Sequence, residues 1–324
     1  MQTMMKAKDL KADIDWTVPA DQGRYDGISQ FLSEAWVAEP KLDGVRSKIV
    51  VGAEDTQVST WRRDVSGNFP HMAAVAMADL AGTVLDGEII APVTKTQSLL
   101  NASVALTNSK PDKAVATQKV IGPAQFWAFD VLQVAGRDIT GWSLEQRRAA
   151  LETVVKVLSL TFPDCEIHLV PQYEPSVEVI EASIDSGFEG VMLKKKTAGY
   201  QYGKRSDGWL KVKRYSTADG FIVGYKPGAN GRSGKVGSVE VAVTDEKGAP
   251  LAVASLGNLD EELQDAMSAE DGSLKQEWYG VCVEWLAQGL NKNGRARHAH
   301  LVRIRPDKTP QDCTKDQLSV FARV

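Results

Sequence analysis

The lysine at position 41 stands in the stretch AEPKLDGVRSKI, which runs between two apolar, strand-like segments. Asp43 and Arg46 follow it at short spacing. A lysine amine becomes a nucleophile when part of its population is unprotonated, which neighbouring cations or the loss of water favour. Lys41 is therefore a candidate for covalent chemistry. The alternative is a surface lysine beside an Asp-Gly turn, which is a common local structure.

Two further lysines, Lys211 and Lys213, alternate along one strand-like segment, so that both side chains face the same way. If that face meets Lys41, the cations disfavour each other's protons and together bind a phosphate. Glu88 and Glu189 each stand beside an apolar strand-like run. Carboxylates that act with phosphate oxygens suit Mg²⁺, or Mn²⁺ in its place, so both are candidate metal ligands. The alternatives are solvated strand ends or ordinary salt bridges with the lysines.

The composition is that of a globular protein, and the chain of 324 residues has room for about two domains. No apolar run is long enough to span a bilayer and no secretory signal is visible, so we expect a cytoplasmic protein without a membrane partner. The three cysteines form no CxxC pair, which argues against a zinc site. The net charge of −4 is no sign of nucleic-acid binding, but lysine and arginine crowd between Lys194 and Arg214, so one basic face is expected.

The hydrophobic pattern predicts a mixed succession of strands and helices up to about residue 215. The first thirty residues form an amphipathic leader that we expect to be helical in part. Residues 91–125 form a polar, less regular insertion with a weak helical pattern at its start. Phe129, in FWAFDVL, is either a core residue or a flat surface for a nucleobase. The predicted helices cover residues 69–82, 143–158 and 176–187, and the predicted strands lie at 36–40, 45–52, 56–61, 83–92, 126–134, 167–173, 189–196 and 209–215.

After Tyr215 the pattern changes to short strands separated by glycine-rich turns. About five such strands in roughly a hundred residues suggest a small barrel, for which an OB-fold is the natural candidate. We therefore expect a first domain over residues 1–216 and an OB-fold domain over 217–324.

Six fragments, KLDGVR, LDGEI, FWAFDVL, EGVMLK, WLKVKR and LVRIRPDK, occur in this order along the chain. This set resembles the motifs of the covalent nucleotidyltransferase superfamily, which comprises ATP-dependent DNA ligases, RNA ligases and mRNA capping enzymes. The resemblance extends over nearly the whole chain. It implies an α+β fold, in which a nucleotidyltransferase (adenylation) domain of antiparallel sheets with helices is followed by an OB-fold β-barrel.

The resemblance also implies roles for individual residues. Lys41 is similar to the nucleophile that attacks the α-phosphate of ATP and forms a lysyl–AMP bond. Glu39 resembles the residue that reads the adenine amino group, and Phe129 resembles the ring that stacks on adenine. Lys211 and Lys213 are similar to the paired lysines on the α-phosphate.

The remaining roles concern the ribose, the metal and the leaving group. Arg46 resembles the arginine that holds the ribose and later the 5′-phosphate end, and Glu88 resembles a ribose contact that supports metal binding. Glu189 is similar to the metal-linked carboxylate. Arg62 resembles a motif arginine that meets the nucleotide, although the adjacent Arg63 is an alternative because Trp61 replaces the usual serine. Arg305, Asp307 and Lys308 match the OB-domain motif that orients pyrophosphate.

Within this superfamily the sequence is most similar to a small ATP-dependent DNA ligase of phage or bacterial type with two domains. No large N-terminal helical domain, zinc-finger cysteine set or C-terminal helix-hairpin-helix region is visible. We expect a monomer that seals 3′-hydroxyl/5′-phosphate nicks in duplex DNA with ATP and Mg²⁺. The alternatives are an RNA ligase, a capping guanylyltransferase, or a non-catalytic OB-fold protein that binds nucleic acid.

Overall fold

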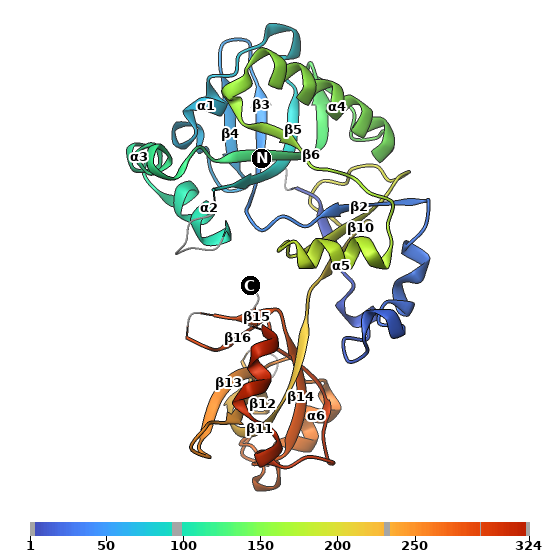
Figure 1. Cartoon of the computed structure of the whole chain (residues 1–324), viewed down its shortest axis with the longest axis vertical. Helices are drawn as coiled ribbons and strands as arrows, with labels where there is room; N and C mark the ends of the chain where they lie inside the picture. The colour runs from blue at the N-terminus through green and yellow to red at the C-terminus, as the bar shows by residue number, and fades with distance from the viewer. Residues whose placement is uncertain (1–3, 93–98, 230–233, 292, 322–324) are drawn as a thin grey trace. The chain divides into compact units, whose positions relative to one another are not determined.

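The computed structural model describes residues 4–92, 99–229, 234–291 and 293–321. The chain divides into two compact units (Figure 1). Unit 1 contains Met1–Ile14 and Tyr25–Lys213, and unit 2 contains Asp15–Arg24 and Arg214–Val324. None of the helices in the described ranges is long and apolar enough to cross a membrane.

Unit 1 is built on two sheets. The first has the strand order β4-β3-β5-β6-β7, with β8 added against β6. Its strands are β3 (Val45–Val51), β4 (Thr56–Thr60), β5 (Val84–Ile90), β6 (Gln125–Val134), β7 (Arg137–Asp138) and β8 (Ile167–Leu169). The second has the order β1-β10-β9-β2, formed by β1 (Lys6–Asp9), β2 (Trp36–Pro40), β9 (Gly190–Lys195) and β10 (Arg205–Lys213).

The sheets of unit 1 are mainly antiparallel, as the resemblance implies, but two pairs are parallel. β1 pairs in parallel with β10, and β8 pairs in parallel with β6. The predicted N-terminal leader is thus a strand followed by short 3₁₀ helices at Lys11–Asp13, Ala20–Gln22 and Asp26–Phe31. The strand β1 completes the edge of the second sheet, a long-range pairing that the local pattern did not indicate.

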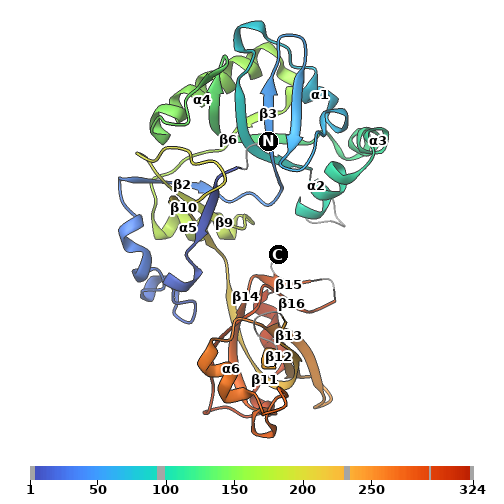
Figure 2. The same ribbon diagram turned by 180° about the vertical axis from the view of Figure 1, so that it is seen from behind.

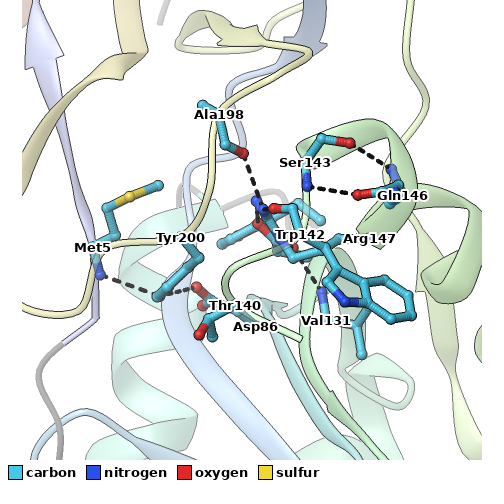
Figure 3. A network of polar contacts seen from close by, with 12 residues as sticks. Met5, Asp86, Val131, Thr140, Trp142, Ser143, Gln146, Arg147, Ala198 and Tyr200 are labelled. Atoms are coloured by element: carbon cyan, nitrogen blue, oxygen red, sulfur yellow. Dashed lines mark hydrogen bonds and ion pairs between the residues drawn. The ribbon is translucent and has the colours of Figure 1, made fainter. Parts of the chain in front are cut away.

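Helix α4 (Leu144–Thr161) confirms the predicted helix at 143–158. Ser143 caps it: the Gln146 amide donates to Ser143 Oγ at 3.2 Å, and the Ser143 amide donates to Gln146 Oε1 at 3.0 Å (Figure 3). Leu151, Val154 and Leu158 are buried on one stripe and pack in the core of the first sheet. Helix α5 (Val177–Asp185), capped by Ser176, contacts β9 of the second sheet.

Two predictions for unit 1 were wrong. The expected helix over 69–82 is only α1 (Pro70–Ala73), followed by a 3₁₀ helix at Ala78–Leu80. The Met77 amide donates to the Gly52 carbonyl at 2.9 Å, so this segment pairs with the end of β3 instead of continuing the helix. The insertion is more regular than expected: it contains α2 (Leu99–Asn108) and α3 (Pro111–Ile121), which contact each other and share one hydrophobic core with α4 (Figures 1 and 2). Its buried Ala102, Leu106 and Ala114 join the core.

A buried polar network joins α4 to the first sheet and to the loop that follows β9 (Figure 3). The Arg147 side chain is fully buried and pairs with Asp130 of β6 through two bonds, at 2.8 and 2.9 Å. It also donates to the carbonyl of Ala198, which follows β9, at 3.0 Å. Two-bond arginine–carboxylate pairs of this kind are geometrically specific, so the network fixes how α4 and the loop after β9 meet.

Unit 2 is an antiparallel sheet in the order β13-β12-β11-β14-β17. Its strands are β11 (Ser216–Pro227), β12 (Val236–Thr244), β13 (Pro250–Leu256), β14 (Cys282–Ala287) and β17 (His300–Ile304). Helix α6 (Glu261–Met267) lies between β13 and β14 in the chain, and β15 (Gly289–Leu290) pairs with β16 (Ala296–Arg297). The core contains Trp285, whose ring stacks on Phe321 at 5.0 Å between centroids. Trp16, from the Asp15–Arg24 segment of this unit, packs on Tyr215.

Candidate active site

A pocket of about 370 Å³ lies within unit 1. Strands β2, β9 and β10 of the second sheet and β3, β5 and β6 of the first sheet contribute its lining. Eight of the predicted site residues line it together: Glu39, Lys41, Arg46, Glu88, Phe129, Glu189, Lys211 and Lys213.

Backbone pairing beyond the end of β2 positions Lys41. Its amide donates to the Gly190 carbonyl at 2.8 Å, and the Glu189 amide donates to the Lys41 carbonyl at 3.1 Å. Lys213 pairs in register with Gly190 on the neighbouring strand. The Glu189 carboxylate therefore meets both lysines: Lys41 Nζ contacts its Oε2, and Lys213 Nζ lies 2.6 Å from its Oε1. One carboxylate thus bridges two ammonium groups at the wall of the pocket.

The two acidic residues of the pocket have opposite electrostatic surroundings. Burial on its own would raise the pKa of Glu189, but Lys41 and Lys213 outweigh this effect and hold that pKa below its ordinary value. Glu88 accepts a hydrogen bond from the Gly44 amide at 3.2 Å. Loss of water raises the pKa of Glu88 to about 7, although Lys41 and Arg46 act to lower it. Glu88 therefore changes charge near neutral pH, whereas Glu189 stays ionised there.

Arg46 is held by contacts from three parts of unit 1. Its Nε and Nη2 pair with the buried Asp86 at 3.1 and 2.6 Å, and Nη2 lies 3.2 Å from the Tyr200 hydroxyl. That hydroxyl donates to Asp86 at 2.7 Å and accepts from the Met5 amide at 3.1 Å (Figure 3). Burial opposes the charge of Arg46, but Asp86 outweighs it and raises the arginine pKa. The guanidinium also lies 5.4 Å from the centre of the Phe129 ring.

The strand β1 supplies a partner for Lys211. Asp9 is in register with Lys211, and its carboxylate lies 3.3 Å from Lys211 Nζ. The two lysines of β10 both line the pocket, but they have different acidic partners, because Lys213 pairs with Glu189.

Glu39 and Lys194 form a buried pair at another part of the pocket lining. Their side chains are 2% and 1% exposed, and Lys194 Nζ lies 2.6 Å from Glu39 Oε2. The sequence analysis counted Lys194 among the residues of an expected basic face. The Lys194 side chain is instead buried beside Phe129 and Trp209.

The candidate motif arginines, Arg62 and Arg63, and the residues of the predicted OB-domain motif are not among the residues that line this pocket. Arg62 is exposed and lies over the Trp61 ring at 4.6 Å, and Arg63 donates to Asn108 Oδ1 at 2.8 Å beside α2. The choice between Arg62 and Arg63 as the motif arginine stays a prediction. Arg305 and Lys308 belong to unit 2, where both pair with Asp219 of β11 and Arg305 also pairs with Asp307 at 2.8 Å.

The described residues include no cluster of three or more acidic, histidine or cysteine side chains that would hold a metal by itself. Glu88 and Glu189 are nevertheless two carboxylates in one pocket. Such a pair fits Mg²⁺, which usually keeps several waters and takes one or two carboxylates together with substrate phosphates.

The sequence analysis missed Asp9, Asp86, Lys194 and Tyr200. Asp86 had a visible signal, because it lies two residues before Glu88 in the same strand and can reach across to Arg46 on the adjacent strand. Tyr200 and Asp9 had none, since their contacts join segments more than a hundred residues apart.

Comparison with known proteins agrees with these observations. Residues 22–213 match the family model of the ATP dependent DNA ligase domain. The chain is 30% identical over 313 residues to the multifunctional non-homologous end joining protein LigD of Mycobacterium bovis, covering 89% of this chain and 38% of that protein. It is 28% identical to a probable DNA ligase of Nocardia farcinica, covering 88% of this chain and 60% of the relative. The chain thus spans less than two thirds of the length of these relatives.

Solved structures agree in fold. A structure from a study of Lig E DNA ligases, described as DNA binding with a minimal scaffold, matches with a TM-score of 0.61 at 22% identity, over 94% of this chain and all of that chain. The ligase domain of M. tuberculosis LigD matches with a TM-score of 0.50 at 23% identity, over 97% of this chain and 98% of that chain. By the family match over most of its length, this chain belongs to the ATP-dependent DNA ligase family.

Proposed function

We propose that this chain seals 3′-hydroxyl/5′-phosphate nicks in duplex DNA, with ATP as the source of AMP. The supporting observation is the contact between Lys41, Glu189 and Lys213 at the wall of one pocket. Attack on a phosphate requires an amine nucleophile, a carboxylate that can take its proton, and a second cation that stabilises the phosphate charge. Membership of the ATP-dependent DNA ligase family supplies the reaction class.

In the first step the Lys41 amine attacks the α-phosphorus of ATP. The Nζ–P bond forms as the P–O bond to pyrophosphate breaks, and the amine proton passes to the contacting Glu189 carboxylate or to water. Negative charge on the α-phosphate oxygens is stabilised by Lys213 and Lys211, which line the same pocket. AMP then passes to the 5′-phosphate of the nick, and the 3′-hydroxyl displaces it.

Three other pocket residues bind the nucleotide in this proposal. Glu39 accepts a hydrogen bond from the adenine amino group, and Phe129 provides a flat surface for the base. Arg46, fixed by Asp86 and Tyr200, contacts the ribose and later the 5′-phosphate. The orientation of pyrophosphate by Arg305 and Lys308 stays a prediction.

Mg²⁺ also belongs to the proposal, with Glu88 and Glu189 as its protein ligands. When bound, it would neutralise charge on the phosphate oxygens. The raised pKa of Glu88 agrees with this role, because a buried carboxylate without enough positive charge around it holds its proton more tightly.

The proposal also assigns an OB-fold to unit 2. Its strands β11, β12 and β13 form a meander, α6 follows, and β14 and β17 extend the sheet on the other side of β11. This order suits a five-stranded, partly open barrel. Near the end of β13, the Asn258 side chain bonds the backbone of Leu301 in β17 at 2.8 and 3.4 Å, which brings the two edges of the sheet toward each other.

In this proposal the chain acts as a monomer and contacts mainly the sugar-phosphate backbone of the DNA. Sealing should therefore depend little on base sequence, and DNA affinity should fall as the salt concentration rises. A nick-sealing assay tests the function. Purified chain with ATP and Mg²⁺ should seal nicked duplex DNA, and Lys41→Ala should seal none. Sealing of nicked RNA in preference to DNA would indicate an RNA ligase, and use of GTP alone would indicate a capping enzyme.

A further inference from the structure

The strand β9 carries three consecutive lysines with very different surroundings. Lys194 is 1% exposed and lines the pocket, whereas the next residue, Lys195, points to the other face of the strand and is exposed. A fully buried lysine is unusual because an unpaired ammonium is costly to remove from water. Lys194 must therefore be stabilised by its neighbours.

The Lys194 ammonium has polar and aromatic partners. It pairs with Glu39 Oε2 at 2.6 Å and donates to the Phe129 carbonyl at 3.2 Å. It lies 4.2 Å from the centre of the Trp209 ring and 4.6 Å from that of Phe129. Contacts with ring faces at these distances add cation–π attraction. These contacts hold the charge of Lys194 at one point of the pocket lining.

The Glu39 carboxylate is held from two sides. Lys194 contacts Oε2, and the Gln172 side chain donates to Oε1 at 2.8 Å. An ionised carboxylate can accept about four hydrogen bonds, so acceptor capacity remains for a ligand. Because the Lys194 ammonium and the Gln172 amide are both donors to this carboxylate, its oxygens are offered to a ligand as acceptors. Without that cation, a buried carboxyl group takes up a proton and becomes a donor as well.

We propose that Lys194 is a positioning residue that sets the base selectivity of the pocket by keeping Glu39 an obligate hydrogen-bond acceptor. Adenine presents an amino group at its 6-position, which donates, whereas guanine presents an oxygen there, which only accepts. A fixed acceptor therefore favours the 6-amino purine and repels the 6-oxo purine. This inference rests on the proposed function, because it assumes that Glu39 meets the base.

The test measures nucleotide binding rather than AMP transfer. In the Lys41→Ala chain, which cannot form the covalent bond, calorimetry gives the Kd of ATP and of GTP with Mg²⁺ present. We expect a preference for ATP, and we expect the added Lys194→Met change to reduce the ATP-to-GTP preference at least about tenfold. Lys195→Met is the matched control, since it removes the neighbouring lysine from the exposed face, and it should leave the preference unchanged. Lys194→Arg keeps the charge and should stay within about threefold of the reference.

The outcomes separate selectivity from stability. If Lys194→Met does not fold, the pair Lys194→Met with Glu39→Gln removes both charges, and it should fold with the same loss of preference. An unchanged preference in the folded single or paired variant would overturn the inference. The inference would also be overturned if the Lys41→Ala reference chain showed no preference for ATP over GTP. The same holds if Lys194→Arg lost this preference as fully as Lys194→Met. If the reference prefers ATP but the wild type transfers no AMP, the proposed function fails while this inference stands.

Discussion

Replacement of Glu88 by glutamine tests the electrostatics of the pocket. Glu88 lies in β5 and is only partly exposed, and the loss of water raises its pKa to about 7 from an ordinary value of 4.5. The folded chain therefore holds the Glu88 proton more tightly than the unfolded chain does. Glutamine has nearly the same shape but no proton to exchange in this range, so it removes the effect with little change in packing.

The size of the effect follows from the two pKa values. They differ by about 2.5 pH units, and each unit corresponds to about 1.4 kcal/mol, so ionised Glu88 costs the folded chain about 3 kcal/mol. The stabilising contribution of the proton is fully present below pH 4.5 and is lost as the pH rises through 7. Between pH 5.5 and 8 the wild type should lose about 2 kcal/mol of unfolding free energy relative to Glu88→Gln.

The assay is urea unfolding at a series of pH values, with EDTA present so that no metal ion compensates Glu88. Hydrogen exchange followed by mass spectrometry on peptides from β3 and β5 assigns the transition to unit 1. The exposed Glu54, in the turn between β3 and β4, provides a control, and Glu54→Gln should follow the wild type at every pH. Parallel pH profiles for wild type and Glu88→Gln would refute the reasoning.

Other predictions concern single contacts. Glu189→Gln weakens the bridge between the two pocket lysines, so single-turnover AMP transfer should slow about a hundredfold, and an unchanged rate would remove this carboxylate from the chemistry. Asp86→Asn leaves Arg46 without its charged partner, so chemical denaturation should show a loss of about 3 kcal/mol and the KM for ATP should rise, whereas unchanged values would contradict the role of this pair. Asp219 pairs with Arg305 and Lys308, which are predicted to orient pyrophosphate, so Asp219→Asn should slow self-adenylation but not the sealing of a nick that already carries AMP. Equal slowing of both steps would show a purely structural role. EDTA should stop AMP transfer, added Mg²⁺ should restore it, and full transfer in EDTA would exclude a metal requirement.

The sequence pattern predicted those parts of the site that depend on strand alternation. Lys211 and Lys213 share a face because side chains alternate along a strand, and both line the pocket with Lys41 and Glu189. The motifs that contain these four residues lie in strands or directly beside strand ends, and the sheet pairing brings them to one pocket. Their chemical roles remain predictions until they are tested.

The partners of these residues could not be predicted in the same way. Whether Lys194 faces water or the core depends on the packing of Phe129 and Trp209 around it, and these residues are distant in sequence. The strand β1 pairs with β10 across about two hundred residues, so Asp9 had no local signal. The sequence contained only a weak helical hint for the insertion, because small residues such as Ala102 and Ala114 fill buried positions of α2 and α3 and make the apolar pattern weak.

The central claim is that the amine at position 41 takes up AMP. Intact-mass measurement after incubation with ATP and Mg²⁺, followed by peptide mapping, tests it directly. The account predicts a mass gain of one adenylate on the peptide that contains Lys41, and no gain in Lys41→Ala. An adduct on any other side chain, or a chain that seals nicked DNA with Lys41 replaced, would contradict it.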